Sequence, residues 1–248
     1  MRVALLTDPH VIEPWFSLSD WSQVLLETQS LNPDLILLGG DYSGYNIKNS
    51  TLVSDQKIAE AASKIGAPLG TFAAIGNHDW SCNELLGGTW GGRLVFERAF
   101  EGQGIKVLRN QSMKLSHNGR SFWLAMTDSD SYDPRVMTEL RRPTDIEKTL
   151  SPTFSDDDPV VLLAHEPDVF AKHHPRVDVQ LSGHMHAGQV NMLGWTPASL
   201  PSRYGDRYLY GHIQERGKDL IVSGGLGYSR LPVRVGAPPE ITVVSLEI

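Results

Sequence analysis

Polar side chains that can bind metals follow short apolar runs at five points of this chain. The five stretches are Asp8-Pro9-His10, Gly39-Gly40-Asp41, Gly76-Asn77-His78-Asp79, His165 and Gly183-His184-Met185-His186. Short apolar runs are typical of strands buried on both faces, and ligands of open α/β sheets bind beyond the carboxyl ends of the strands. We therefore expect the five stretches to meet at one sheet edge and to bind two metal ions.

Helical spacing alternates with these apolar runs in the first third of the chain. Strands are predicted at 3–7, 35–38 and 69–75, and helices at 17–29 and 55–64. This alternation implies parallel pairing of the strands. Further strands are predicted at 107–108, 113–115, 122–126, 160–164, 179–182, 220–223 and 241–246, and further helices at 94–103, 145–150 and 167–173. We expect a single domain over residues 1–248, with helices outside the sheets.

Composition limits the classes of partner and compartment. The chain has 248 residues, is 40% hydrophobic and carries a net charge of -7 without any Lys or Arg block, so duplex nucleic acid is not an expected partner. No apolar run reaches about 18 residues, and therefore no membrane span is predicted. The single cysteine, Cys82, fits a reducing compartment and is interpreted as a packing residue. We expect a cytoplasmic protein, although an anchor removed from the natural N-terminus would leave no trace here.

Asp8, His10 and Asp41 supply the first donors. Asp8 and His10 stand two residues apart, where they could point the same way and chelate one ion through an oxygen and a nitrogen. Asp41 follows two glycines that allow a close approach of the backbone to a metal. A carboxylate has two oxygens and can bridge two cations, whereas Gly-Gly-Asp alone would fit a turn equally well.

The remaining stretches add an amide and several imidazoles. Asn77 offers a carbonyl oxygen, His78 could donate a proton to a leaving oxygen, and Asp79 could orient the imidazole of His78. His184 and His186 would share one face of an extended segment, so one site could collect both.

In chain order, the motifs Asp-x-His, Gly-Asp, Gly-Asn-His-Asp, a later His and Gly-His-x-His resemble those of the calcineurin-like metallophosphoesterase superfamily. The resemblance covers essentially the whole chain. Residues 183–190 and 224–241 also resemble a bacterial branch of small phosphodiesterases, which includes cell-wall-associated enzymes and UDP-2,3-diacylglucosamine hydrolases. The resemblance implies a four-layer α/β/β/α sandwich with two central mixed β-sheets and a binuclear metal site at the carboxyl ends of the strands.

The resemblance further implies a role for each site residue. One divalent ion would be held by Asp8, His10 and His186, the other by Asn77, His165 and His184, and Asp41 would bridge the two. A hydroxide bridging the ions would attack phosphorus in line, and His78 would protonate the leaving alkoxide. Manganese, iron and zinc all suit this mixed oxygen and nitrogen donor set.

Three positions depart from the pattern of the superfamily. Gly44 stands where many relatives have a second Asp, Ala164 precedes the isolated His where Gly is frequent, and Ala187 follows Gly-His-Met-His where this branch often has Gly. None of these changes removes an expected ligand.

The substrate is less constrained than the site. Residues 190–217 could form a lid, and they carry Trp195, Tyr204, Tyr208 and Tyr210, which could stack a base or line an acyl pocket but are better interpreted as packing residues. Arg203, Arg207, Arg230 and Arg234 could clamp a phosphate, although pairing within the protein suits any single one better. His212 is the best candidate ligand outside the five stretches.

These residues lead us to expect a phosphodiesterase or pyrophosphatase acting on a small-molecule or lipid-linked phosphoester. A phosphomonoesterase, a UDP-2,3-diacylglucosamine-type hydrolase and a non-catalytic, metal-stabilised binding protein are the alternatives. His78 beside a full set of ligands favours an enzyme.

Overall fold

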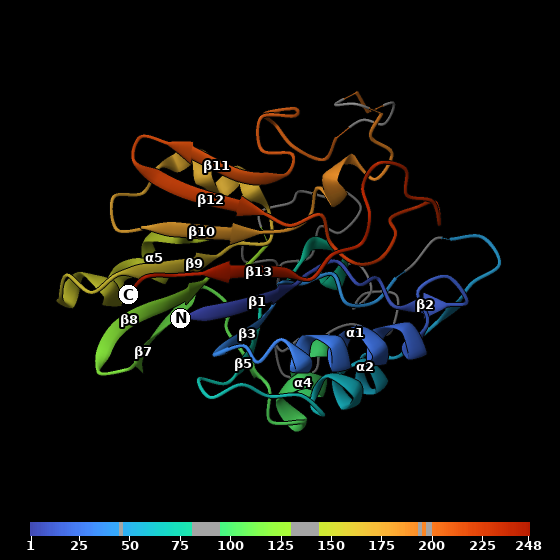
Figure 1. Cartoon of the computed structure of the whole chain (residues 1–248), viewed down its shortest axis with the longest axis horizontal. Helices are drawn as coiled ribbons and strands as arrows, with labels where there is room; N and C mark the ends of the chain where they lie inside the picture. The colour runs from blue at the N-terminus through green and yellow to red at the C-terminus, as the bar shows by residue number, and fades with distance from the viewer. Residues whose placement is uncertain (45–46, 81–94, 130–143, 193–194, 197–199) are drawn as a thin grey trace.

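Two β-sheets form the centre of the molecule (Figure 1). The computed structural model describes residues 1–44, 47–80, 95–129, 144–192, 195–196 and 200–248. Sheet 1, in the order β13-β1-β3-β5-β6, contains β1 (Arg2–Leu6), β3 (Leu35–Leu38), β5 (Thr71–Ala73), β6 (Lys106–Val107) and β13 (Thr242–Ser245). Sheet 2, in the order β11-β12-β10-β9-β8-β7, contains β7 (Gln111–His117), β8 (Arg120–Met126), β9 (Val160–Leu163), β10 (Val179–Ser182), β11 (Gly211–Glu215) and β12 (Lys218–Val222). A third, small sheet pairs β2 (Ile12–Glu13) with β4 (Thr51–Leu52).

Helices cover the outer face of each sheet, so the predicted four-layer α/β/β/α sandwich is confirmed. On sheet 1 lie α1 (Leu18–Ser30), α2 (Asp55–Ala62) and α4 (Val95–Gly102), and on sheet 2 lies α5 (Ile146–Leu150), followed by the 3-10 helix Ser151–Ser155 (Figure 1). Side chains alternate along β1 because its residues point to opposite faces in turn. Ala4 and Leu6 pack against the helices, whereas Val3 and Leu5 pack against sheet 2.

Parallel pairing brings the carboxyl ends of the strands to one edge in both sheets. β1, β3, β5 and β6 are parallel neighbours in sheet 1, as are β8, β9, β10 and β12 in sheet 2. Antiparallel strands, β13 in one sheet and β7 and β11 in the other, complete both sheets and make them mixed. The first turn of α1 is fixed by a capping box between Ser17 and Asp20.

Two segments differ from the prediction. No strand was predicted within residues 190–217, but Gly211–Glu215 forms β11 and pairs with β12. The turn between these strands holds Arg216 and Gly217 at φ values of 51° and 72°, a two-residue hairpin geometry that Gly favours. The predicted helix at 167–173 is a 3-10 helix, Pro167–Lys172.

Cys82 and most of 129–143 lie outside the described residues. No helix within the described ranges is both long and apolar enough to cross a bilayer.

Candidate metal centre

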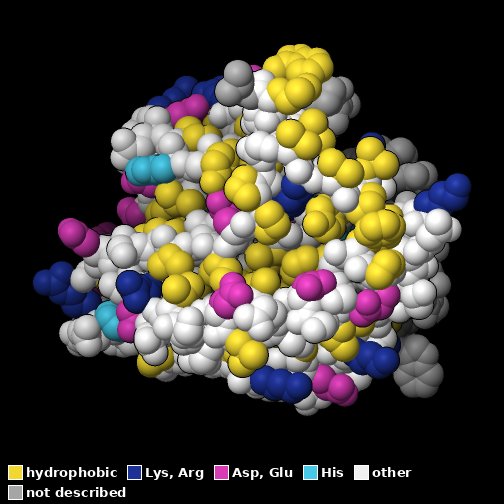
Figure 2. All heavy atoms as spheres, turned by 45° about the vertical axis from the view of Figure 1, so that its right-hand side comes forward, with side chains coloured by type: hydrophobic (Ala, Val, Ile, Leu, Met, Phe, Trp, Pro, Cys, Tyr) yellow, Lys and Arg dark blue, Asp and Glu magenta, His cyan; other side chains and the backbone are white. Residues whose placement is uncertain are grey.

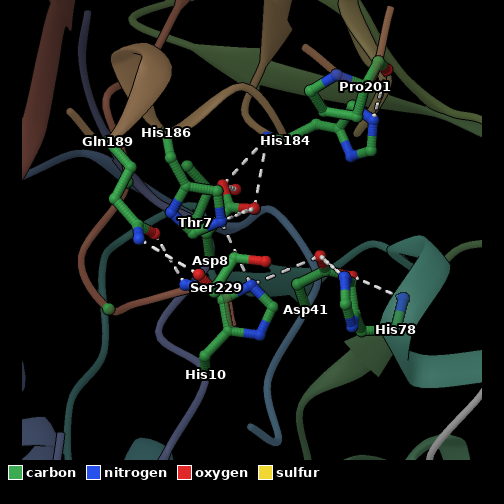
Figure 3. Close-up of polar contacts among 12 residues, drawn as sticks. Thr7, Asp8, His10, Asp41, His78, His184, His186, Gln189, Pro201 and Ser229 are labelled. Carbon is green, nitrogen blue, oxygen red and sulfur yellow. Dashed lines mark hydrogen bonds and ion pairs between the residues drawn. The ribbon is translucent and has the colours of Figure 1, made fainter. Parts of the chain in front are cut away.

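The five donor stretches meet at the shared edge of the two sheets, as predicted. In sheet 1, Asp8 and His10 follow β1, Asp41 follows β3, and Asn77, His78 and Asp79 follow β5. In sheet 2, His165 follows β9, and His184 and His186 follow β10. Figure 3 shows side chains from both sheets turned toward one another, with Asp8 and Asp41 among the imidazoles.

One oxygen, Oδ2 of Asp41, lies at the centre of this cluster. The Nε2 atoms of three imidazoles surround it, at 3.3 Å for His165, 3.5 Å for His10 and 3.8 Å for His78. The other carboxylate oxygen, Oδ1, accepts a hydrogen bond of 2.8 Å from the backbone N–H of His78. Burial raises the pKa of Asp41, but the neighbouring imidazoles, His165 first among them, outweigh burial and hold this pKa well below its usual value. Asp41 is therefore an anion directed at positive charge.

Asp8 is a second buried carboxylate that lies among imidazoles. Its Oδ1 atom lies 3.6 Å from Nε2 of His186 and 3.8 Å from Nε2 of His165. Its Oδ2 atom accepts hydrogen bonds from the Thr7 hydroxyl at 2.7 Å and from the backbone N–H of His184 at 2.9 Å. These bonds fix the carboxylate and leave one oxygen facing the imidazoles.

Three groups of donor atoms lie close enough to hold an ion. The groups are Asp8 with His10 and His186, His10 with Asp41 and His78, and Asp41 with His165 and His184; within each, the donor atoms lie within 4.8 Å of one another. Asp41 belongs to two of the three. A carboxylate shared in this way is what a bridging ligand between two cations requires.

Hydrogen bonds to the far nitrogen orient two of the imidazoles. Nδ1 of His165 lies 2.7 Å from the carbonyl oxygen of Gly39, and Nε2 of His184 lies 2.9 Å from the carbonyl oxygen of Pro201. A carbonyl can only accept, so each of these nitrogens carries the proton. When the ring is neutral, its other nitrogen presents a lone pair, which is the form in which histidine binds a metal.

Two buried donor atoms test whether this site suits a metal. Oδ1 of Asn77 and Nε2 of His165 are buried and make no hydrogen bond within the described part of the chain. A buried polar atom without a partner is costly, and a cation would satisfy both atoms. The donors are carboxylate and amide oxygens together with imidazole nitrogens, a set that divalent manganese, iron and zinc accept. The residues present therefore fit the expected ions.

Asp79 has a different role from the one predicted. We expected its carboxylate to orient the imidazole of His78, but both of its oxygens are bonded to the backbone. Oδ2 accepts from the N–H groups of Asp41 and Gly76, and Oδ1 accepts from that of Tyr42. Asp79 therefore joins the loop after β3 to the loop after β5 and positions Asp41. Its spacing next to His78 was misleading because the first turn of a helix directs adjacent side chains apart.

The backbone itself is unusual at five of the seven expected metal ligands. Their φ values are positive: 54° for Asp8, 43° for His10, 59° for Asp41, 71° for His184 and 51° for His186. This left-handed region is uncommon for residues other than Gly and clusters at functional sites, where surrounding structure holds it in place. The residue types alone gave no sign of this conformation.

Glycines allow close packing at the site, between the two sheets at Gly183 and between loops of sheet 1 at Gly76 and Gly44. A Cβ atom on Gly183 would lie 2.1 Å from Oγ1 of Thr7, and one on Gly76 would lie 2.2 Å from Oδ1 of Asp41. Gly44 replaces the second Asp of many relatives, and a Cβ atom there would lie 2.5 Å from the carbonyl oxygen of His10. In this chain, the loop after β3 therefore leaves no room for that Asp.

Arg234 also contacts the site, in a way that its sequence position did not reveal. Its guanidinium donates to the carbonyl oxygens of Gly224, Gly227 and Ala237, and its Nη2 atom lies 3.1 Å from Nδ1 of His186. The guanidinium of Arg234 is thus bonded to three carbonyl oxygens and one imidazole nitrogen. It fixes the segment after β12 against His186, one of the expected metal ligands.

Other residues considered from sequence lie outside the cluster. Tyr208 is buried against Phe170, and Arg207 forms a two-pronged ion pair with Glu215. His212 pairs with Asp219 at 2.6 Å and lines a cavity of about 320 Å³ with Ile221 and Leu246, residues of the strands rather than of the metal edge. The packing interpretation therefore holds for Tyr208 and Arg207.

Comparison with known proteins agrees with this geometry. The sequence model of the calcineurin-like phosphoesterase family matches residues 1–188, which is more than half of the chain. The chain belongs to the calcineurin-like phosphoesterase family. Membership indicates a metal-dependent phosphoester hydrolase and accounts for the His and Asp clusters as sites for divalent ions.

Two curated relatives extend over the whole chain. A metallophosphoesterase of Bacillus subtilis, YkuE, is 34% identical over 99% of this chain and 79% of its own length. A transmembrane protein with a metallophosphoesterase domain from Danio rerio is 27% identical over the full chain but over 53% of its own length. The chain thus spans about half of this second relative.

Solved structures share the fold at low sequence identity. The sulfate thiohydrolase SoxB of Thermus thermophilus gives a TM-score of 0.55 at 11% identity, over 90% of this chain and 51% of that one. The NAD nucleotidase of Haemophilus influenzae also gives 0.55, at 13% identity, over 93% of this chain and 45% of that one. Both are longer proteins, and the similarity concerns the fold alone.

Proposed function

We propose that this calcineurin-like phosphoesterase binds two divalent ions and hydrolyses phosphodiesters or pyrophosphates. Asp8, His10 and His186 would hold one ion, Asn77, His165 and His184 the other, and Asp41 both. The observation that carries the proposal is the position of Asp41 Oδ2, with the Nε2 atoms of His165, His10 and His78 at 3.3, 3.5 and 3.8 Å. When bound, two such ions activate water as a nucleophile and neutralise charge on the phosphoryl oxygens.

His78 is proposed to assist departure of the leaving oxygen. Burial, together with the nearby imidazoles, lowers the pKa of His78 to about 4, although Asp41 opposes the shift. The imidazole is therefore neutral at pH 7 and can offer an N–H group to the leaving oxygen. As the P–O bond breaks, negative charge grows on that oxygen, and a hydrogen bond from this N–H group stabilises the charge.

The preference for a diester rests on the basic groups of the site. A terminal phosphate carries one more ionisable oxygen than a diester and gains from an additional cation. Within the described residues, Arg234 is the arginine that contacts an expected metal ligand, His186. Its guanidinium is also bonded to three carbonyl oxygens. A monoanionic diester or an internal pyrophosphate therefore suits this site better.

Hydrolysis assays on metal-loaded protein test the proposal. We expect turnover of bis(p-nitrophenyl) phosphate, faster than that of p-nitrophenyl phosphate, with at least one of manganese, iron, zinc or cobalt. Absence of hydrolysis with all four metals would refute an esterase, and a preference for the monoester would indicate a phosphomonoesterase instead.

The variant His78→Gln tests the proposed donor. Turnover of a diester with a poor leaving group should fall by about 10²–10⁴-fold, while both ions are retained. His117→Gln, a change on β7, is the matched control and should leave turnover unchanged. Unchanged turnover in His78→Gln, with metal content intact, would remove His78 from the mechanism.

A further inference from the structure

Exposed hydrophobic side chains lie on two segments next to the metal centre. We call this set the apolar rim: Met192, Trp195, Leu231, Val233 and Val235. Trp195 is 60% and Leu231 66% exposed, the largest values among the exposed large hydrophobic residues of these segments. Figure 2 shows hydrophobic side chains gathered over the face that includes the loop between β12 and β13. A soluble protein rarely leaves such a group exposed without a function.

Hydrogen bonds join the two segments into one surface. The backbone N–H of Asn191 donates to the carbonyl of Val235, and the N–H of Val235 donates to the carbonyl of Gln189, at 2.8 and 2.9 Å. The side chain of Gln189 donates to the carbonyl oxygens of Ser229 and Leu231 and accepts from the N–H of Ser229. These hydrogen bonds hold the two segments together, so the apolar rim is a defined part of the folded surface.

The same segments adjoin the metal ligands. His186 stands three residues before Gln189, and Arg234, between Val233 and Val235, lies 3.1 Å from Nδ1 of His186. The N–H of Gly227 donates to the carbonyl oxygen of Asp8 at 2.8 Å. The apolar rim is therefore on the segments that contact the candidate metal ligands His186 and Asp8.

The two segments that carry the apolar rim differ in charge from the chain as a whole. The protein has a net charge of -7, yet residues 184–205 and 220–239 contain no Asp or Glu and carry Arg203, Arg230 and Arg234. Arg230 is exposed beside Leu231, in a left-handed conformation with φ of 64°. Exposed Trp and aliphatic side chains with arginine beside them suit an interface of acyl chains and anionic headgroups.

We propose that the apolar rim docks onto an anionic phospholipid surface and brings the metal centre to phosphoesters carried by lipids. A hydrophobic partner would explain the exposed Trp195 and Leu231, and an anionic surface would explain the absence of Asp and Glu from residues 184–205 and 220–239. The docking step stands on the apolar rim alone, while the identity of the substrate as a phosphoester rests on the proposed function.

Vesicle sedimentation tests the docking. We expect the protein to bind vesicles that contain phosphatidylglycerol and phosphatidylcholine more tightly than vesicles of phosphatidylcholine alone. The double variant Trp195→Ser/Leu231→Ser should lose at least about tenfold in binding, because two large apolar groups no longer leave water. Arg230→Gln should lose about fivefold, and this loss should vanish at high salt. Leu26→Ser on α1 is the matched control, since Leu26 is 61% exposed.

Turnover of soluble bis(p-nitrophenyl) phosphate by the same variants separates the two proposals. Docking without turnover would refute the esterase and leave the apolar rim as a membrane surface. Turnover without vesicle binding, or equal loss of binding in Leu26→Ser and the double variant, would overturn the docking. A dimer in light scattering that the double variant converts to a monomer, without vesicle binding, would make the apolar rim a contact between two chains.

Discussion

The two sheets contribute different chemistry to the same site. The strand ends of sheet 1 carry the carboxylates and the amide, in Asp8, Asp41 and Asn77, together with His10 and His78, whereas those of sheet 2 contribute imidazoles, in His165, His184 and His186. Sheet 1 therefore supplies the negative charge, and sheet 2 supplies imidazoles that close the site. The clusters Asp8–His10–His186 and Asp41–His165–His184 each combine donors from both sheets.

Sheet 2 also has a carboxylate at a strand end, but its surroundings give it another role. Asp128 follows β8 and bonds to Nε of Arg109 at 2.8 Å and to Nε1 of Trp80 at 3.0 Å. Arg109 in turn bonds to Glu97 on α4. Asp41 faces imidazoles, whereas Asp128 faces a guanidinium and an indole. The position of a carboxylate at a strand end is thus not enough to make it a ligand, because its partners decide.

The largest effect should come from removing the shared carboxylate of sheet 1. Asp41→Asn should lose both ions and reduce turnover by more than about 10²-fold, since even outer partners of metal ligands cost 10–100-fold. Elemental analysis of the purified protein gives the metal content. Asp219→Asn, at the far end of the sandwich, is the control. Two ions per chain in Asp41→Asn would show that Asp41 does not bridge.

A smaller loss should follow from removing one imidazole of sheet 2. In His165→Ala we expect one ion per chain to remain, held by Asp8, His10 and His186, with a turnover reduced by about 10²-fold. Calorimetric titration of the metal-free variant should show a single binding event. If His165→Ala lost both ions, as Asp41→Asn is expected to do, the two sheets would not differ in their contribution to metal binding.

The pH dependence of stability should separate Asp128 from the site carboxylates. Burial raises the pKa of Asp128 to about 6, against the opposing effect of Arg109, from an ordinary value of 3.8. Between pH 4 and 6 the folded state therefore binds more protons than the unfolded chain, and the free energy of unfolding falls as pH rises through this window. The fall should amount to about 3 kcal/mol and level off above pH 6.

Urea denaturation at several pH values measures this contribution. Asp128→Asn should lack that part of the decline, so the difference between variant and native protein should change between pH 4 and 6. A constant difference across this window would mean that the pKa of Asp128 is not raised.

The smallest of these effects concerns the contact between the sheets. Gly183→Ala places a Cβ atom 2.1 Å from Oγ1 of Thr7, and the overpacking should lower the free energy of unfolding by about 1–3 kcal/mol. Gly66→Ala is the matched control, because a Cβ atom there meets nothing within 4 Å. Similar unfolding midpoints in the two variants would show that the sheets can move apart at this point.

Much of this site could be predicted from the order of residue types. Apolar runs such as Leu35–Leu38 specify buried parallel strands, and the polar residues directly after them must then share an edge. The partners of each side chain were harder to predict. Asp79 follows His78 in sequence, yet its carboxylate bonds to Asp41, Tyr42 and Gly76, because side-chain direction depends on a helical turn that the motif alone does not specify.

Local conformation was the other part that sequence could not provide. The positive φ values of Asp8, His10 and His186 arise from the surrounding loops, whose hydrogen bonds hold a conformation that these residue types seldom adopt. β12 was predicted at 220–223, but β11 was missed because Gly211–Glu215 is short and only partly buried, so the alternation of apolar and polar residues is weak. The Arg-Gly pair at 216–217 was the available signal.

The glycines at the metal edge have a consequence for the size of the substrate. Gly183 brings the backbone of the loop after β10 against the side chain of Thr7 on the opposite sheet, so contact between main chain and side chain sets the spacing of the sheets there. A spacing set in this way cannot widen through the repacking of side chains. Proteins with this site would then adapt to substrates of different size through the loops outside the sheets, while the position of the reacting phosphorus stays the same.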